Sequence, residues 1–168
     1  MNGGWAAVVL LLVLGCGPEV VVPVDTLLWR VDEWKASSPG VRVGTATILS
    51  FRSSGEYVEL HARVIERADT TVYIASDDPR IVMVGTWTRD GDTIRATRTR
   101  VKRPTPFRGP REPFCDEKLS FEISGRSVQG NAGDTEPGSY SPVTRLVAPE
   151  FEMYATDARE NGWECVVR

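Results

Sequence analysis

The only histidine in the chain, His61, is the starting point of any search for catalytic chemistry. A Ser-His-Asp site needs an imidazole as general base, and a catalytic zinc site usually needs two or three. His61 lies between Glu59 and Arg63 on the polar side of an alternating stretch, and no serine stands in a GxSxG turn. We therefore expect His61 to be a solvated surface residue. We predict no catalytic residue, no metal site and no cofactor.

Paired carboxylates are the remaining source of acid–base chemistry, because a glycosidase needs only two of them about 5 to 10 Å apart. The candidates are neighbours in the sequence or lie on expected turns, namely Asp77 with Asp78, Asp116 with Glu117, and Glu150 with Glu152. Nothing in their spacing places a pair across a cleft. Solvated charges are the expectation, and a hydrolase that uses a carboxylate pair is the alternative.

A basic stretch between residues 89 and 111 contains eight Arg and Lys residues and two acidic ones. Such a local excess could attract an anion or an acidic partner. On a regular strand Arg95 falls on the face opposite Arg98 and Arg100, so a single basic stripe would require a β-bulge. The alternative is a solvated hairpin arm whose charges pair with the acidic C-terminal part. The residues of the candidate anion or partner surface are Arg95, Arg98, Arg100, Lys102 and Arg103.

The N-terminus carries an apolar run of ten residues, Trp5–Leu14, which ends in the sequence LVLGC at residues 12 to 16. The run is too short to cross a membrane as a helix, which takes about 20 residues. It fits the apolar core of an export signal. LVLGC resembles the lipobox of bacterial lipoproteins. The resemblance implies cleavage before Cys16, a diacylglycerol on its thiol and an acyl chain such as palmitate on its amino group. A plain signal peptide and an uncleaved apolar N-terminus are the alternatives.

The location that this resemblance implies is the bacterial cell envelope. Two or more acyl chains hold a protein stably on a membrane that it does not span. Gly17 rather than Asp follows the cysteine, which by the same resemblance favours the outer membrane. An exported protein with a net charge of -3 is a poor candidate for binding nucleic acid, so we expect none as a partner.

Two further cysteines, Cys115 and Cys165, form an even pair once Cys16 is committed to lipid. In an oxidising compartment an even pair is read first as a disulfide. Two buried thiols or a metal pair are the alternatives, and the absence of CxxC spacing argues against a metal.

The chain divides into a signal peptide (1–15), a tether (16–24) and a single domain (25–168). Two prolines in GPEVVVPV favour a tether. From Asp25 the apolar residues Leu27, Leu28, Val31 and Trp34 recur at helical spacing up to SSPG, which predicts a short N-terminal helix. An edge strand at 26 to 31 is the competing interpretation.

From Gly44 onward the pattern predicts β-strands joined by turns. In the strand that begins at Tyr57, the residues from Val58 to Val64 alternate between an apolar face and a polar face that carries Glu59. Asp90-Gly91 predicts a two-residue hairpin turn in which both central residues have positive φ. The same reading extends to the C-terminus, where EFEMYA (150–155) and WECVVR (163–168) are expected strands. An antiparallel all-β meander, either a barrel or a sandwich, is the predicted fold.

GTWTRDGDTIRAT (85–97) and LSFRSSGEYVEL (49–60) are similar to the strand–turn–strand units of lipocalin-like envelope lipoproteins. The resemblance implies a closed antiparallel barrel whose cavity or rim binds a small molecule or another protein. We therefore expect a lipid-anchored, non-enzymatic envelope protein that binds a hydrophobic or amphipathic ligand or a partner protein. A structural or assembly lipoprotein without a ligand is the alternative from a different class, beside the hydrolase.

Overall fold

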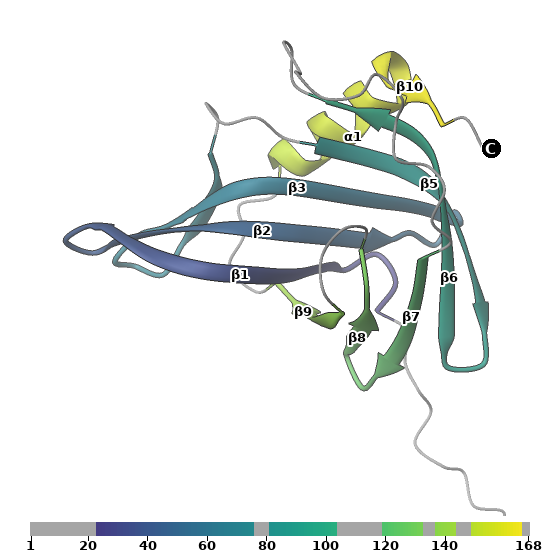
Figure 1. Cartoon of the computed structure of the whole chain (residues 1–168), viewed down its shortest axis with the longest axis horizontal. Coiled ribbons are helices and arrows are strands. Elements are labelled where there is room, and N and C mark those ends of the chain that lie inside the picture. The colour runs from purple at the N-terminus through teal and green to yellow at the C-terminus, as the bar shows by residue number, and fades with distance from the viewer. Residues whose placement is uncertain (1–22, 76–80, 104–118, 133–136, 144–148, 166–168) are drawn as a thin grey trace, which may run out of the picture.

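The computed structural model describes residues 23–75, 81–103, 119–132, 137–143 and 149–165. Within these ranges the chain is built mainly of β-strands, with one α-helix near the C-terminus (Figure 1). The expected signal peptide and most of the expected tether lie outside the described residues. The elements are β1 (Leu27–Ser38), β2 (Val41–Phe51), β3 (Glu56–Glu66), β4 (Val72–Ile74), β5 (Ile81–Asp90), β6 (Thr93–Lys102), β7 (Leu119–Ser124), β8 (Ser127–Gly130), β9 (Gly138–Pro142), α1 (Pro149–Asn161) and β10 (Trp163–Glu164).

Eight of the described strands close into an antiparallel barrel. Each of β1, β2, β3, β5, β6, β7, β8 and β9 pairs with the next one, and β9 returns to pair with β1 through Leu28 and Trp29. β4 adds to the edge of β3, and β10 adds to β6. The predicted all-β meander is therefore confirmed, and it forms a barrel rather than a sandwich.

The barrel has one closed end and one open end. The turn after β2 (residues 52–55), the β5–β6 hairpin and the β7–β8 hairpin gather at the closed end. At the other end β1, β2 and β3, which are 11 or 12 residues long, extend well past the four- to six-residue strands β7, β8 and β9. The three long strands therefore project from the barrel as a sheet, seen at the left of Figure 1.

The predicted N-terminal helix is wrong, because residues 27 to 38 form β1, which pairs with β2 along its length. A register shift between Val31 and Glu33 explains the misleading pattern. The bulge inserts one residue, so the half-buried apolar positions Leu27, Val31 and Trp34 are spaced by four and three residues although the backbone is extended. A bulged strand can thus imitate helical periodicity.

The expected strand at 150 to 155 is also wrong, because this segment belongs to α1. Pro149 is the first helical residue, a position where a missing N–H has no cost. Phe151, Ala155 and Ala158 recur at helical spacing and are buried, whereas Met153 is 57 % exposed. The apparent alternation of Phe151, Met153 and Ala155 was therefore accidental.

Helix α1 covers the outside of the barrel next to β5 and β6, so the sheet is apolar on both of its faces. The outer cluster includes Ile48 and Leu60 together with Phe151 of the helix. The inner cluster fills the lumen near the closed end and contains Leu28, Leu49, Phe51, Tyr57, Phe121 and Tyr140. The expectation that the polar face of β3 is solvated is therefore wrong at Glu59, which is fully buried.

Aromatic rings plug the closed end. Phe51 lies 5.4 to 5.7 Å, centroid to centroid, from Tyr57, Trp87 and Phe121. Two of these three contacts are edge-to-face, an arrangement that aromatic pairs favour. Trp87 donates its indole N–H to the Arg52 carbonyl at 2.8 Å, which ties the plug to the turn after β2.

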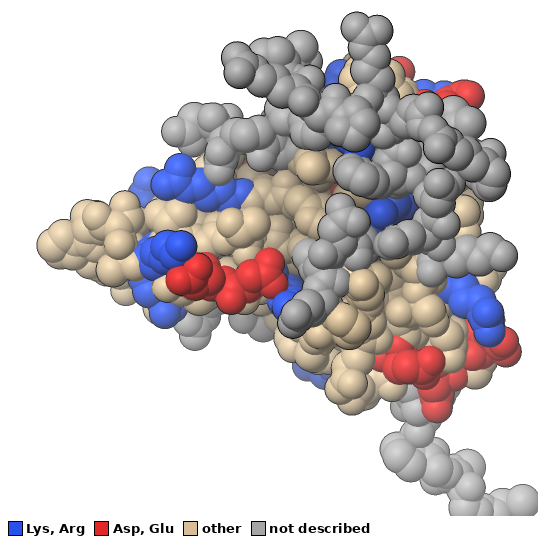
Figure 2. Space-filling view, viewed as in Figure 1, with Lys and Arg blue, Asp and Glu red and all other residues tan. Residues whose placement is uncertain are grey.

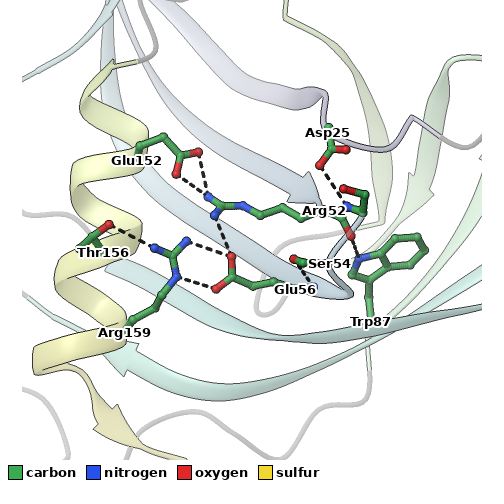
Figure 3. A network of polar contacts seen from close by, with 9 residues as sticks. Asp25, Arg52, Ser54, Glu56, Trp87, Glu152, Thr156 and Arg159 are labelled. Carbon is green, nitrogen blue, oxygen red and sulfur yellow. Dashed lines mark hydrogen bonds and ion pairs between the residues drawn. The ribbon is translucent and has the colours of Figure 1, made fainter.

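A ladder of ion pairs fastens α1 to the same end of the barrel (Figure 3). Arg52 makes two hydrogen bonds to Glu152 of the helix, at 2.8 and 2.9 Å, and one ion pair to Glu56 at 2.8 Å. Glu56 in turn accepts two hydrogen bonds from Arg159, at 2.6 and 2.9 Å. Burial would raise the pKa of Glu56, but the bonds from Arg159 and the charge of Arg52 outweigh it, so that the pKa lies below its ordinary value.

The predicted hairpin between β5 and β6 is confirmed, one residue later than expected. Asp90 pairs with Thr93, so Gly91 and Asp92 are the two central residues. Gly91 has a φ of 61°, while Asp92 is not among the described residues with positive φ. The predicted left-handed conformation therefore holds at only one of the two central positions.

A bulge in the same strand pair decides which basic residues face the lumen. Val84 pairs with Arg100 and Gly85 with Arg98, so Thr99 is the extra residue. A Cβ at position 85 would lie 2.0 Å from the Thr97 carbonyl oxygen, so the close approach requires glycine. The bulge reverses the alternation of β6, with the result that Arg98 faces inward and Arg100 outward.

Candidate functional site

The floor of the lumen is an ion pair between Glu59 of β3 and Arg98 of β6. Arg98 donates through Nε to Oε2 of Glu59 at 3.0 Å, and through Nη2 to Oε1 at 2.9 Å and Oε2 at 2.8 Å. The two side chains are 0 % and 3 % exposed. Gly85 separates Tyr57 from Arg98 in the same row across the sheet, so no side chain from β5 blocks the contact.

Two neighbours on β3 complete the hydrogen bonding of Glu59. Tyr57 donates its hydroxyl to Oε2 at 2.9 Å, and His61 Nε2 donates to Oε1. These three residues alternate along the strand and point to the same side of it. The Glu59 carboxylate thus accepts hydrogen bonds from three side chains, which is the condition under which a charge can be buried.

This arrangement keeps Glu59 ionised inside the protein. Burial acts to raise the pKa of Glu59, but the hydrogen bond from His61 and the charge of Arg98 outweigh it and leave the pKa lower than its ordinary value of 4.5. Burial, reinforced by the negative charge of Glu59, raises the pKa of Tyr57 well above 10.0. The Tyr57 hydroxyl therefore remains protonated and acts as a donor.

His61 is not the solvated surface residue that we expected. Its side chain is 24 % exposed and lies between Glu59 and Thr47 of β2, whose hydroxyl is 3.4 Å from Nδ1. The sequence of carboxylate, imidazole and hydroxyl has the order of a catalytic triad. However, Thr47 is only 3 % exposed and Glu59 is already paired with Arg98. His61 therefore helps to neutralise the buried Glu59 carboxylate, and the Thr47 hydroxyl is not exposed to a substrate as a nucleophile would be.

Above this floor a pocket of about 360 Å3 opens on the lumen-facing side of the projecting sheet. We call it the mouth pocket. The register places Glu33 of β1, Thr45 of β2 and Arg63 of β3 side by side in one row, directly beyond the row that contains Thr47 and His61. Figure 2 shows acidic and basic side chains next to one another over the projecting strands. The residues that line the mouth pocket are Glu33, Lys35, Ala36, Ser37, Val43, Gly44, Thr45 and Arg63.

The five basic residues of the predicted anion or partner surface do not form one surface. Arg98 and Arg103 are 4 % and 5 % exposed, so their assignment to a surface is wrong. Arg98 shares the inward face with Ile94 and Ala96, and the bulge at Thr99 turns Arg100 to the other face. The outward-facing members instead pair with acidic residues. Arg100 binds Glu164 at 3.2 Å, Lys102 lies 3.8 Å from Asp157, and Arg95 lies 3.5 Å from Asp90. Two of these three partners belong to the acidic C-terminal part, as in the alternative interpretation.

Several predicted residues lie outside the described part of the chain, among them Cys16, Cys115, Asp77, Asp78, Asp116 and Glu117. Cys165 is described and packs against Met83 and Val101, but its disulfide with Cys115 stays a prediction.

Glu152 forms an ion pair with Arg52 and stands two residues from Glu150 on α1, so the structure does not assemble Glu150 and Glu152 as a catalytic pair. Trp87 belongs to the plug, whereas Trp163 is 54 % exposed.

No known family matches the sequence. No curated protein matches it either. Among the described residues, no three His, Cys, Asp or Glu side chains lie close enough together to hold a metal ion. The described helix is too short and too polar to cross a bilayer. What this chain can do must therefore be argued from the lumen and the mouth pocket.

Sequence reasoning missed the Glu59–Arg98 pair because 39 residues separate the two partners. Both residues also belong to stretches in which polar and apolar side chains alternate, so each was assigned to a polar face. One signal was available in hindsight. β3 is apolar at Val58, Leu60 and Ala62, and Tyr57 on the other face is also a residue that favours burial. A strand with two apolar faces would place Glu59 in the core, where it needs a cation.

We predict that Glu59 and Arg98 are strongly coupled in stability. Glu59→Gln and Arg98→Met should each lower the free energy of unfolding by about 3–5 kcal/mol, because each leaves the other charge or a buried polar group without its partner. The double variant should lose clearly less than the sum of the two. Urea unfolding followed by tryptophan fluorescence measures all three values.

The matched control is Arg95→Met, which removes another arginine of β6, the one that forms the exposed ion pair with Asp90 of β5. It should change the free energy of unfolding by about 0.5 kcal/mol or less. Strict additivity of the Glu59 and Arg98 variants, or an equal effect of Arg95→Met, would contradict the assignment of a buried pair.

Proposed function

We propose that this protein is a lipid-anchored protein of the bacterial cell envelope that binds a small amphipathic ligand at the open end of its barrel. The single observation that carries the proposal is the mouth pocket. It combines a volume of about 360 Å3, within the range of small-molecule sites, with both charged and apolar lining residues. A partner protein is the other kind of ligand that the sequence left open.

The character of the lumen favours an amphipathic ligand over a purely apolar one. Aromatic rings already fill the closed end, so little apolar volume remains there. The described surfaces that a ligand would meet first are polar, because Thr45 and Arg63 stand in front of His61. A ligand without a polar group would leave these side chains desolvated and unpaired, at a cost of about 1–3 kcal/mol for each such group.

The proposed anchor is compatible with an accessible pocket, since the chain enters the barrel at the closed end. Asp25 donates its backbone N–H to the Phe51 carbonyl at 2.9 Å, and its carboxylate accepts from the Ser53 N–H at 3.0 Å. Residues 16 to 23 can span at most about 25 Å. From this entry point β1 runs about 40 Å to the tip of the projecting sheet. A lipid on Cys16 therefore holds the closed end near the membrane and leaves the mouth pocket free.

Native mass spectrometry of the full chain, released from detergent micelles, tests ligand binding. We expect a fraction of the protein to carry one additional small mass that is lost on collisional heating. The variant Val43→Trp, which fills the pocket from one of its own lining residues, should abolish that mass. Val41→Trp, on the same strand but outside this pocket, is the control. A bare wild-type protein under all extraction conditions would refute the proposal.

The anchor has its own test, which is Cys16→Ser with cell fractionation. Acylated wild-type protein should sediment with the membrane and carry the mass of a diacylglycerol and an acyl chain. The variant should lose that added mass, because serine has no thiol to modify. A variant that co-sediments with the membrane at the same lipid-derived mass as the wild type would exclude acylation of Cys16. The same spectra, recorded without reductant, report whether Cys115 and Cys165 are joined in the proposed disulfide.

A further inference from the structure

The charges that face the lumen are nearly all neutralised by partners in the structure. Besides the Glu59–Arg98 pair on the floor, Lys35 lies 3.0 Å from Glu33 at the rim. Arg30, which points into the lumen beside Thr47, binds Asp32 at 3.0 Å. Each of these cations already has a carboxylate at contact distance, so none offers a full charge to a ligand.

Arg63 is the exception. Its guanidinium makes no hydrogen bond or ion pair with any residue that the structure describes, although its backbone carbonyl accepts from Ala75 at 2.9 Å. It is exposed, lines the mouth pocket and stands in register with Thr45. The pocket contains Lys35 and Arg63 against a single carboxylate, Glu33, so its lining is positive by one charge.

The surroundings of Arg63 suit the head of an amphiphile better than a freely hydrated ion. The pocket also contains Val43 and Ala36, and half-buried Ile81 stands next to His61 one row deeper. The Glu59 carboxylate beneath them accepts bonds from three side chains, so it needs no cation from a ligand. In the mouth pocket the Arg63 guanidinium and the Thr45 hydroxyl are polar groups that a ligand can bind.

We propose that the mouth pocket selects an amphiphile with an anionic head group, and that Arg63 binds this oxyanion beside the Thr45 hydroxyl. The inference rests on the proposed function and specifies the chemistry of its ligand. A guanidinium presents two parallel N–H donors to a carboxylate or a phosphate, and such charge-assisted bonds are about twice as strong as neutral ones. The short apolar tail lies against the aliphatic residues of the pocket.

Isothermal titration calorimetry of the full chain in phosphatidylcholine nanodiscs, with empty nanodiscs subtracted, tests this selectivity. The probes are octanoate and octanamide, which share one tail and differ in the charge of the head. Octanoate should bind at least about tenfold more tightly. Octyl phosphate separates a site that takes any oxyanion from one that takes only carboxylates.

Arg63→Gln should lower the affinity for octanoate about tenfold and leave the affinity for octanamide unchanged. The matched control is Arg67→Gln, which removes the same charge from an exposed arginine stacked 4.8 Å from the Tyr73 ring, outside the mouth pocket. It should leave both affinities unchanged. Equal binding of both probes, or equal effects of the two variants, would overturn the selectivity and leave the proposed function standing. Binding of neither probe, together with a bare protein in the mass spectra, would refute both.

Discussion

The buried ion pair between Glu59 and Arg98 is the constraint on which the rest of the lumen depends. A carboxylate that is 0 % exposed is tolerated only when its charge is matched and its oxygens are hydrogen-bonded, and both requirements are met here by side chains from β3 and β6. A well-packed apolar core would provide similar or greater stability without such a pair. Its presence makes the middle of the barrel polar, and it separates the aromatic plug on one side from the mouth pocket on the other.

A bulge in the sheet lies next to the ion pair and decides which residues after Arg98 face the lumen. Without the extra residue at Thr99, β6 would keep strict alternation and could not have both Arg98 and Val101 facing inward. The bulge requires glycine at position 85, where a Cβ would collide with the Thr97 carbonyl. Trp87, two residues further along β5, fixes the plug through its bond to the Arg52 carbonyl, and Arg52 also holds α1. The GTW sequence thus links the lumen floor, the plug and the helix.

The sequence was sufficient to predict the all-β meander and the hairpin near Asp90, because these follow from alternation and from turn chemistry over short distances. It was insufficient wherever one residue more or less changes which side chains lie on the same face of an element. The bulge in β1 imitated a helix, and the alternation of Phe151, Met153 and Ala155 imitated a strand. The site depended even more on long-range pairing. His61 was assigned to water because its partner, Glu59, was assigned to the same wet face, and no local pattern connects Glu59 with Arg98 across 39 residues.

The central claim is that Glu59 is ionised inside the barrel, with its pKa held below 4.5 by His61 and Arg98. Since the folded-state pKa is lowered, the stabilisation is complete above the unfolded-state pKa and is lost as the pH falls through the folded-state value. Carbon-detected NMR of the glutamate carboxyl carbons, assigned with Glu59→Gln, measures this directly. The account predicts a Glu59 resonance whose titration midpoint lies below pH 4.5. A Glu59 titration midpoint at or above pH 4.5 while the barrel remains folded would contradict it.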